Sequence, residues 1–139
     1  MSELVTVHVS ETGASPFAVL IETGQHRLTG DEPADMGGAD LGPSPYQILT
    51  AALGECTAMT VRWFARQQEW PVEHISVEVT HRKDNVDGRA GLVDVFVKLV
   101  EIGGDALSAD QRARLLEVAA RCPVHRTLEH GSHITTIEA

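Results

Sequence analysis

Two cysteines are the residues best suited to chemistry in this chain of 139 residues. Cys56 lies within a long segment that has the apolar spacing of a helix. Cys122 opens the run CPVHR (residues 122–126), where Pro123 suits the first position of a helix. A thiol at a helix N-cap gains from unpaired backbone N–H groups and from the helix dipole, and both favour the thiolate. The pair therefore predicts a dithiol redox site. Two cysteines that only pack in the core remain the alternative, because free cysteine is often buried.

Cys56 needs a nearby cation to become reactive, because an apolar setting raises the pKa of a thiol. His125 lies three residues after Cys122 and can come close to that sulfur as well. The candidate thiolate-stabilising residues are Arg27, Arg62 and Arg126, and His26 and His125 are the next candidates. A metal site built from Cys56, Cys122 and His125 is a minor alternative, since no CxxC or HExxH spacing is present. We expect no metal and no cofactor.

A long helix is predicted to position Cys56. Ser44 is a suitable cap, Pro45 suits the first helical position, and Pro71 ends the segment, so the helix should span residues 45–68. At 1.5 Å per residue such a helix is about 36 Å long, enough to cross the domain. One apolar face is formed by Leu49, Ala52, Leu53, Cys56, Met59, Thr60 and Trp63.

The rest of the chain predicts strands and two further helices, an α+β arrangement. Three strands over residues 4–10, 17–21 and 25–29 fit an antiparallel meander. Two more, residues 75–80 and 92–101, pair across a turn at 84–88, with Val93, Val95, Val97 and Leu99 on one face. A helix begins at Ser108, where Gln111 completes a capping box, and a short one starts near Cys122 and ends at Gly131. A last strand is expected over residues 133–137.

Length and composition predict one domain over residues 1–139. The net charge of −9, from 20 acidic residues against 11 Lys and Arg, argues against nucleic-acid binding, which requires a basic surface. No apolar run approaches the ~20 residues of a membrane span, so no membrane partner is expected. Two cysteines do not make a secreted disulfide framework, and the expected location is the cytoplasm.

Two motifs resemble those of one known family. GPSPYQIL (residues 42–49), followed by AALGE (51–55) and CTAMT (56–60), closely resembles the cysteine helix of OsmC-like proteins. These belong to the superfamily of osmotically inducible and organic hydroperoxide resistance proteins. CPVHRTL (122–128) is similar to the second cysteine motif, and Asp31-Glu32-Pro33 with Gly37-Gly38 is similar to the loop between. The resemblance runs in order over nearly the whole chain.

The resemblance implies an α+β, OsmC-like fold in which two chains intertwine as a homodimer, with curved antiparallel sheets around long central helices. It also implies two equivalent active sites at the dimer interface and a role in stress response. Carried over, Cys56 is the peroxidatic residue, oxidised by an organic hydroperoxide to a sulfenic acid, and Cys122 is the resolving one. A cellular dithiol then reduces the disulfide.

The chain departs from the hydroperoxide reductases of that superfamily at two places. They carry a Glu directly after the Pro of the helix start, where this chain has Tyr46. They also use an Arg from the N-terminal strands, and the comparable stretch here, residues 15–18, has none. Arg27 is the substitute if its strand brings it to the site. The alternative functions are a non-catalytic dimeric module that binds a small apolar ligand, and a structural or interaction protein.

Overall fold

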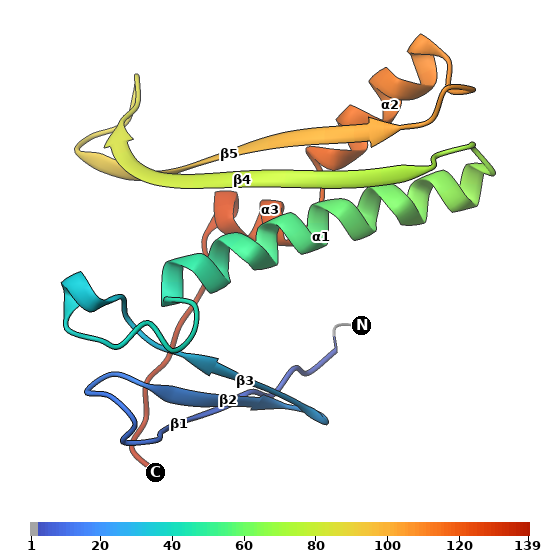
Figure 1. Cartoon of the computed structure of the whole chain (residues 1–139). Coiled ribbons are helices and arrows are strands. Elements are labelled where there is room, and N and C mark those ends of the chain that lie inside the picture. Colours follow the sequence, from blue (N-terminus) through green and yellow to red (C-terminus); the bar gives the residue numbers. More distant parts are fainter. Residues whose placement is uncertain (1–2) are drawn as a thin grey trace. The chain divides into compact units, whose positions relative to one another are not determined.

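Helix α1 spans Pro45–Gln68, as predicted, and is the longest helix of the computed structural model, which describes residues 3–139 (Figure 1). Its start is a capping box. Gln47 N donates to Ser44 Oγ at 3.4 Å, and Ser44 N donates to the Gln47 side chain at 2.8 Å. The described residues form two compact units, one up to Leu49 and one over Thr50–Ala139.

The first unit holds an antiparallel meander of three strands in the order β1-β2-β3, as predicted. The strands are β1 (His8–Glu11), β2 (Val19–Thr23) and β3 (His26–Gly30). Each begins later in the chain than the sequence predicts. β2 and β3 turn directly into each other, because Thr23 pairs with His26 and Gly24 takes the positive φ of +58° that a tight hairpin requires.

A buried carboxylate, Asp31, organises the loop between β3 and α1. It accepts hydrogen bonds from Ser15 Oγ at 2.8 Å and from the backbone N–H groups of Glu32, Ala39 and Leu41. Burial alone would raise the pKa of this carboxyl group, but these hydrogen bonds outweigh it and the pKa is lowered. The same loop contains the short helix η1 (Ala34–Met36). Asp31 therefore fixes the loop that leads into α1 to the rest of the first unit.

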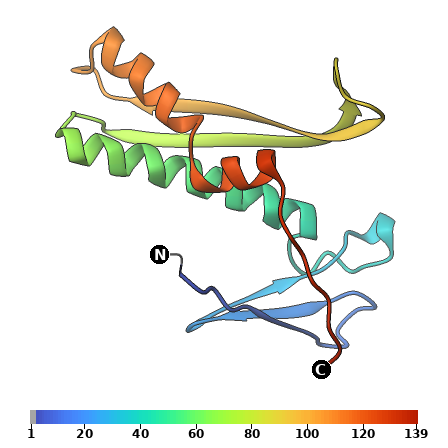
Figure 2. The same ribbon diagram turned by 180° about the vertical axis from the view of Figure 1, so that it is seen from behind.

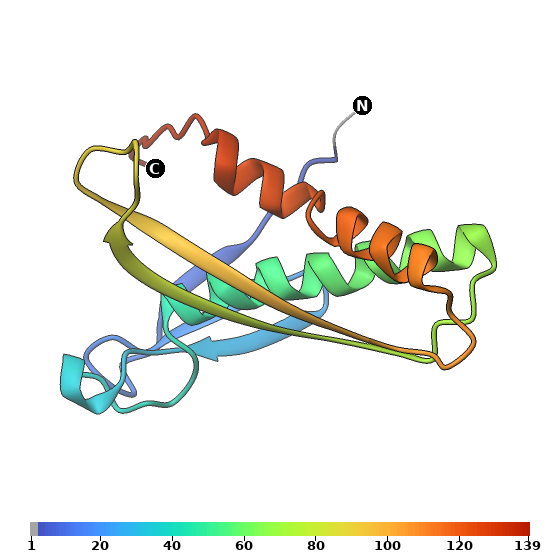
Figure 3. The ribbon, with the colours of Figure 1, turned by 90° about the horizontal axis from the view of Figure 1, so that it is seen from above.

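The second unit is built on a long hairpin of β4 (His74–Asn85) and β5 (Leu92–Gly103), which curves near its turn (Figures 1 and 3). Helices α2 (Ala109–Ala119) and α3 (Pro123–His130) follow. Seen from behind, α3 lies on the same side of the hairpin as α1 (Figure 2). Both strands are longer than predicted. The capping box of α2 at Ser108 and Gln111 is confirmed.

The core of the second unit lies between α1, α2 and one end of the hairpin. Its buried residues are Val61, Ala65, Val72, Leu107, Leu115 and Ala119. Ile75, Val100 and Ile102 of the hairpin pack against this cluster. The face of β5 that carries Lys98, Val100 and Ile102 therefore points toward the helices. The opposite face carries Val97 and Leu99, which are exposed.

Two sequence predictions in this unit need correction. The buried residues of α1 are Leu53, Thr57, Val61 and Ala65, whereas Met59 and Trp63 of the predicted apolar face are 63% and 62% exposed. The predicted last strand, residues 133–137, is wrong, because this segment is exposed and has no regular structure. A strand needs a partner for its backbone groups, and the alternation of its side chains does not supply one.

Candidate active site

Cys122 caps the N-terminus of α3, as the sequence predicts. Its backbone is extended (φ −65°, ψ 150°), Pro123 takes the first helical position, and the His125 N–H donates to the sulfur at 3.3 Å. The side chain is fully buried. A sulfur in this position accepts a hydrogen bond from a backbone N–H group that has no partner within the helix. It also lies at the positive end of the helix dipole.

Cys56 lies on α1 beside Cys122 and is only partly buried. Its sulfur is 4.0 Å from Thr60 Oγ1. Burial raises the pKa of the Cys56 thiol, and the neighbouring Cys122 raises it further. The Val124 N–H and the Thr60 hydroxyl oppose these effects without cancelling them. Cys56 is therefore the more accessible thiol of the pair, and its raised pKa favours the protonated thiol over the thiolate.

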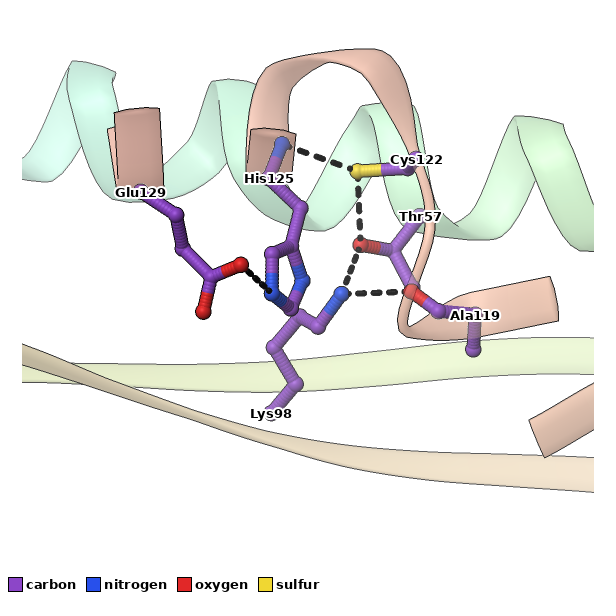
Figure 4. Close-up of polar contacts among 6 residues, drawn as sticks. All are labelled: Thr57, Lys98, Ala119, Cys122, His125 and Glu129. Carbon is purple, nitrogen blue, oxygen red and sulfur yellow. Dashed lines mark hydrogen bonds and ion pairs between the residues drawn. The ribbon is translucent and has the colours of Figure 1, made fainter. Parts of the chain in front are cut away.

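Thr57 and Lys98 complete the site, and sequence reasoning missed both (Figure 4). Thr57 is buried on α1, and its Oγ1 lies 3.5 Å from Cys122 Sγ and 2.8 Å from the Leu53 carbonyl oxygen. Lys98 on β5 donates from Nζ to Thr57 Oγ1 at 3.1 Å and to the Ala119 carbonyl oxygen at 2.6 Å. The hairpin therefore supplies a cation to this site. The signal that could have found Lys98 is its place as a charged residue in an otherwise apolar stretch of β5.

The surroundings of Cys122 favour its charged form. Burial would raise the pKa of this thiol, but the Thr57 hydroxyl, the His125 N–H, the Cys56 thiol and the positive charge of Lys98 together lower it. Burial in turn lowers the pKa of Lys98, against the opposing effect of the nearby sulfurs and of Glu129. The more buried thiol is thus the one better prepared to be a thiolate.

The other predicted site residues are placed differently. The His125 imidazole pairs through Nε2 with Glu129 Oε1 at 3.3 Å, and its buried Nδ1 has no hydrogen-bond partner within residues 3–139. His125 therefore serves Cys122 through its backbone N–H. The side chain of Arg126 is exposed. Arg27 belongs to the first unit, where it pairs with Glu22 at 3.1 Å and is 73% exposed. The roles of Arg27 and Arg126 at the thiols stay predictions.

Within the described part of the chain, no group of three or more His, Cys, Asp or Glu residues is arranged to hold a metal ion. No helix among residues 3–139 is both long and apolar enough to cross a membrane. The candidate site is instead a pair of free thiols, Cys56 and Cys122. The Thr57 hydroxyl contacts the Cys122 sulfur, and the Lys98 ammonium group donates to that hydroxyl.

The chain is thus an α+β protein with one thiol on a long helix and a second thiol that caps a short helix. The sequence profile of OsmC-like proteins matches residues 37–137, and the chain belongs to this family. A comparison with curated proteins gives no significant match. The family assignment confirms the resemblance found in the two cysteine motifs.

Solved structures share the fold at low sequence identity. An OsmC-like protein from Mycoplasma pneumoniae is 22% identical, with a TM-score of 0.74 over 93% of this chain and 89% of that chain. An organic hydroperoxide resistance protein, OsmC, from Legionella pneumophila is 18% identical, with a TM-score of 0.65 over 90% and 88%. The organic hydroperoxide resistance protein OhrB of Bacillus subtilis is 21% identical, with a TM-score of 0.60 over 90% of each chain.

Proposed function

We propose that the chain is a thiol-dependent peroxidase that reduces organic hydroperoxides, with Cys56 as the peroxidatic residue and Cys122 as the resolving one. The observation that supports this proposal is that the two thiols differ in accessibility and in pKa. Cys56 is partly accessible, whereas Cys122 is fully buried with a lowered pKa. Only the accessible sulfur can meet a substrate, and a buried thiolate beside it is suited to attack an intermediate formed there.

The proposed reaction has two steps on the protein. The Cys56 sulfur attacks the terminal peroxide oxygen, the O–O bond breaks, and the thiol proton ends on the alkoxide, giving a sulfenic acid and an alcohol. The Cys122 thiolate then attacks the Cys56 sulfenic sulfur. With one proton from solvent, water leaves and a Cys56–Cys122 disulfide forms. A cellular dithiol reduces this disulfide, restoring both thiols and becoming oxidised itself. No metal or cofactor takes part in this scheme.

The substrate class follows from the residues that flank Cys56. Met59 and Trp63 lie three and seven positions further along α1, so they share its side of the helix, and both are largely exposed. An apolar flank favours a hydroperoxide with a hydrocarbon group over hydrogen peroxide. Two of the structures that share the fold are named organic hydroperoxide resistance proteins, which supports the same substrate class. A dithiol enzyme of this kind suits the reducing cytoplasm.

A titration with cumene hydroperoxide tests the proposal. One equivalent added to the reduced protein should consume both thiols of each chain, and the intact mass should fall by that of two hydrogen atoms. Hydrogen peroxide is the matched control and should react more slowly. If the thiols are inert, and native mass spectrometry recovers a small apolar ligand from the protein, the alternative of a non-catalytic binding module is supported instead.

We also propose that the chain, as one domain over residues 1–139, forms a homodimer with two equivalent sites at the interface. Exposed apolar side chains support this on two surfaces of the second unit, Met59 and Trp63 on α1 and Val97 and Leu99 on the outer face of β5. A second copy that covers Met59 and Trp63 would also enclose Cys56.

Light scattering should therefore report two chains per particle. Trp63→Asp should raise the dimer dissociation constant by at least about tenfold, because it places a charge in an apolar contact. Leu116→Asp, at an exposed position on α2, is the matched control and should leave the dimer intact. A monomeric wild-type protein at micromolar concentration would contradict the proposal.

A further inference from the structure

Lys98 is placed unlike the other lysine of the chain. Lys83 pairs with Asp94 at 2.8 Å, and its side chain is half exposed. Lys98 is partly buried, and its Nζ donates to Thr57 Oγ1 and to the Ala119 carbonyl oxygen (Figure 4). Ala119 is the last residue of α2, so the ammonium group lies at the negative end of that helix dipole. Two acceptors and this dipole favour the charged ammonium form, whereas burial opposes it and lowers the pKa of Lys98.

The Thr57 hydroxyl has one proton and three partners. A charged Lys98 can only donate, so Thr57 Oγ1 must accept from it. The single hydroxyl proton is then available either to the Leu53 carbonyl oxygen at 2.8 Å or to Cys122 Sγ at 3.5 Å. When Cys122 is a thiol, its S–H can donate to the second lone pair of Oγ1. When Cys122 is a thiolate, the hydroxyl turns and donates to the sulfur.

The ionisable groups near Cys122 come from several elements. They are Cys56 on α1, Lys98 on β5 and His125 on α3, and Glu129 of α3 acts on Lys98. On β4, His81 is paired with Asp94 at 2.9 Å. Glu129 already pairs with His125. Among these groups, Lys98 is the cation whose charge lowers the pKa of Cys122.

We propose that Lys98 is a positioning residue of this site: acting through the Thr57 hydroxyl, it holds Cys122 as a thiolate while both cysteines are reduced. Because Lys98 Nζ donates to Thr57 Oγ1, the Thr57 hydroxyl is left free to donate its own proton to Cys122 Sγ, and the His125 N–H donates to the same sulfur from α3. Only the resolving role of that thiolate rests on the proposed function. The ionisation of Cys122 does not, and it can be measured without peroxide.

The test is a pH titration of the thiolate by its ultraviolet absorbance in the full-length Cys56→Ser protein, where Cys122 is the only thiol. The Cys56→Ser/Cys122→Ser protein serves as the blank and removes the contribution of Tyr46. Adding Lys98→Met should lower the thiolate fraction at neutral pH on the order of tenfold, because an opposite charge is lost. Adding Lys98→Arg should retain most of it, and Lys83→Met is the matched control that should change nothing.

A second pair of variants covers the case in which Lys98→Met does not fold, as judged by circular dichroism. Thr57→Val removes the hydroxyl at nearly constant volume and should also lower the thiolate fraction, whereas Thr57→Ser keeps the hydroxyl and should restore it. A folded Lys98→Met protein that titrates like Lys83→Met would overturn the proposal. So would equal thiolate fractions in Thr57→Val and Thr57→Ser. A lowered thiolate fraction in Lys98→Met with unchanged peroxidase activity would support this proposal and count instead against the resolving role of Cys122 in the proposed function.

Discussion

Cys56→Ser should lower the rate of cumene hydroperoxide consumption by about a thousandfold or more, to the rate of free thiol in solution or below. A hydroxyl is a far weaker nucleophile than sulfur at neutral pH, and the remaining thiol, Cys122, is fully buried. The measurement is the loss of peroxide under single-turnover conditions, with the reduced variant in excess. Serine is the smallest available change, so the packing of α1 should be preserved.

The opposite result has a definite meaning for this site. If Cys56→Ser consumed peroxide at the wild-type rate, Cys122 would be the attacking residue, in keeping with its lowered pKa. Its burial would then have to be relieved by a motion of α3. Comparing Cys56→Ser with Cys122→Ser in the same experiment therefore decides between accessibility and thiolate character as the property that selects the nucleophile.

Cys122→Ser should retain the first turnover and lose the following ones, with steady-state turnover on a dithiol lower by on the order of a hundredfold. Cys56 can still be oxidised, but the intramolecular thiolate that would attack its sulfenic acid is gone. Serine is a good N-cap, so α3 should still form. The measurements are steady-state peroxide consumption and trapping of the sulfenic acid by a dimedone probe.

Treatment of Cys122→Ser with excess peroxide provides a second test of the resolving role. Without a resolving thiol, the Cys56 sulfenic acid should proceed to sulfinic acid, which adds the mass of two oxygen atoms and is not reversed by dithiols. The wild-type protein under the same conditions should remain at the disulfide. Wild-type turnover by Cys122→Ser would mean that an external reductant reacts directly with the sulfenic acid.

The parts of the fold defined by local signals could be predicted from the sequence. Ser44 and Pro45 fixed the start of α1, and Cys122 with Pro123 fixed the start of α3, because helix ends depend on a few neighbouring residues. The β-meander and the hairpin were also predicted, with strand ends shifted by a few residues. The two cysteine motifs indicated the family that the sequence profile matches.

What could not be predicted depends on contacts between elements. In β5 the apolar residues Val97 and Leu99 lie on the outer face, and the face turned toward the helices carries Lys98. Alternation shows which residues share a face of a strand, but not which face the helices cover. The exposure of Met59 and Trp63 on α1 has the same origin, since an apolar residue can face its own chain or another.

The pairing of Val79 with Lys98 in the hairpin ties the chemistry of the site to strand alignment. Deleting one residue of β5 between the turn and Lys98 would turn this ammonium group to the outer face and bring a neighbouring aliphatic side chain toward Thr57. Insertions in the turn at residues 86–91 leave the pairing intact. Sequence drift should therefore be tolerated at the tip of the hairpin and resisted along its length, so that the ionisation of Cys122 becomes a chemical reporter of correct β-pairing.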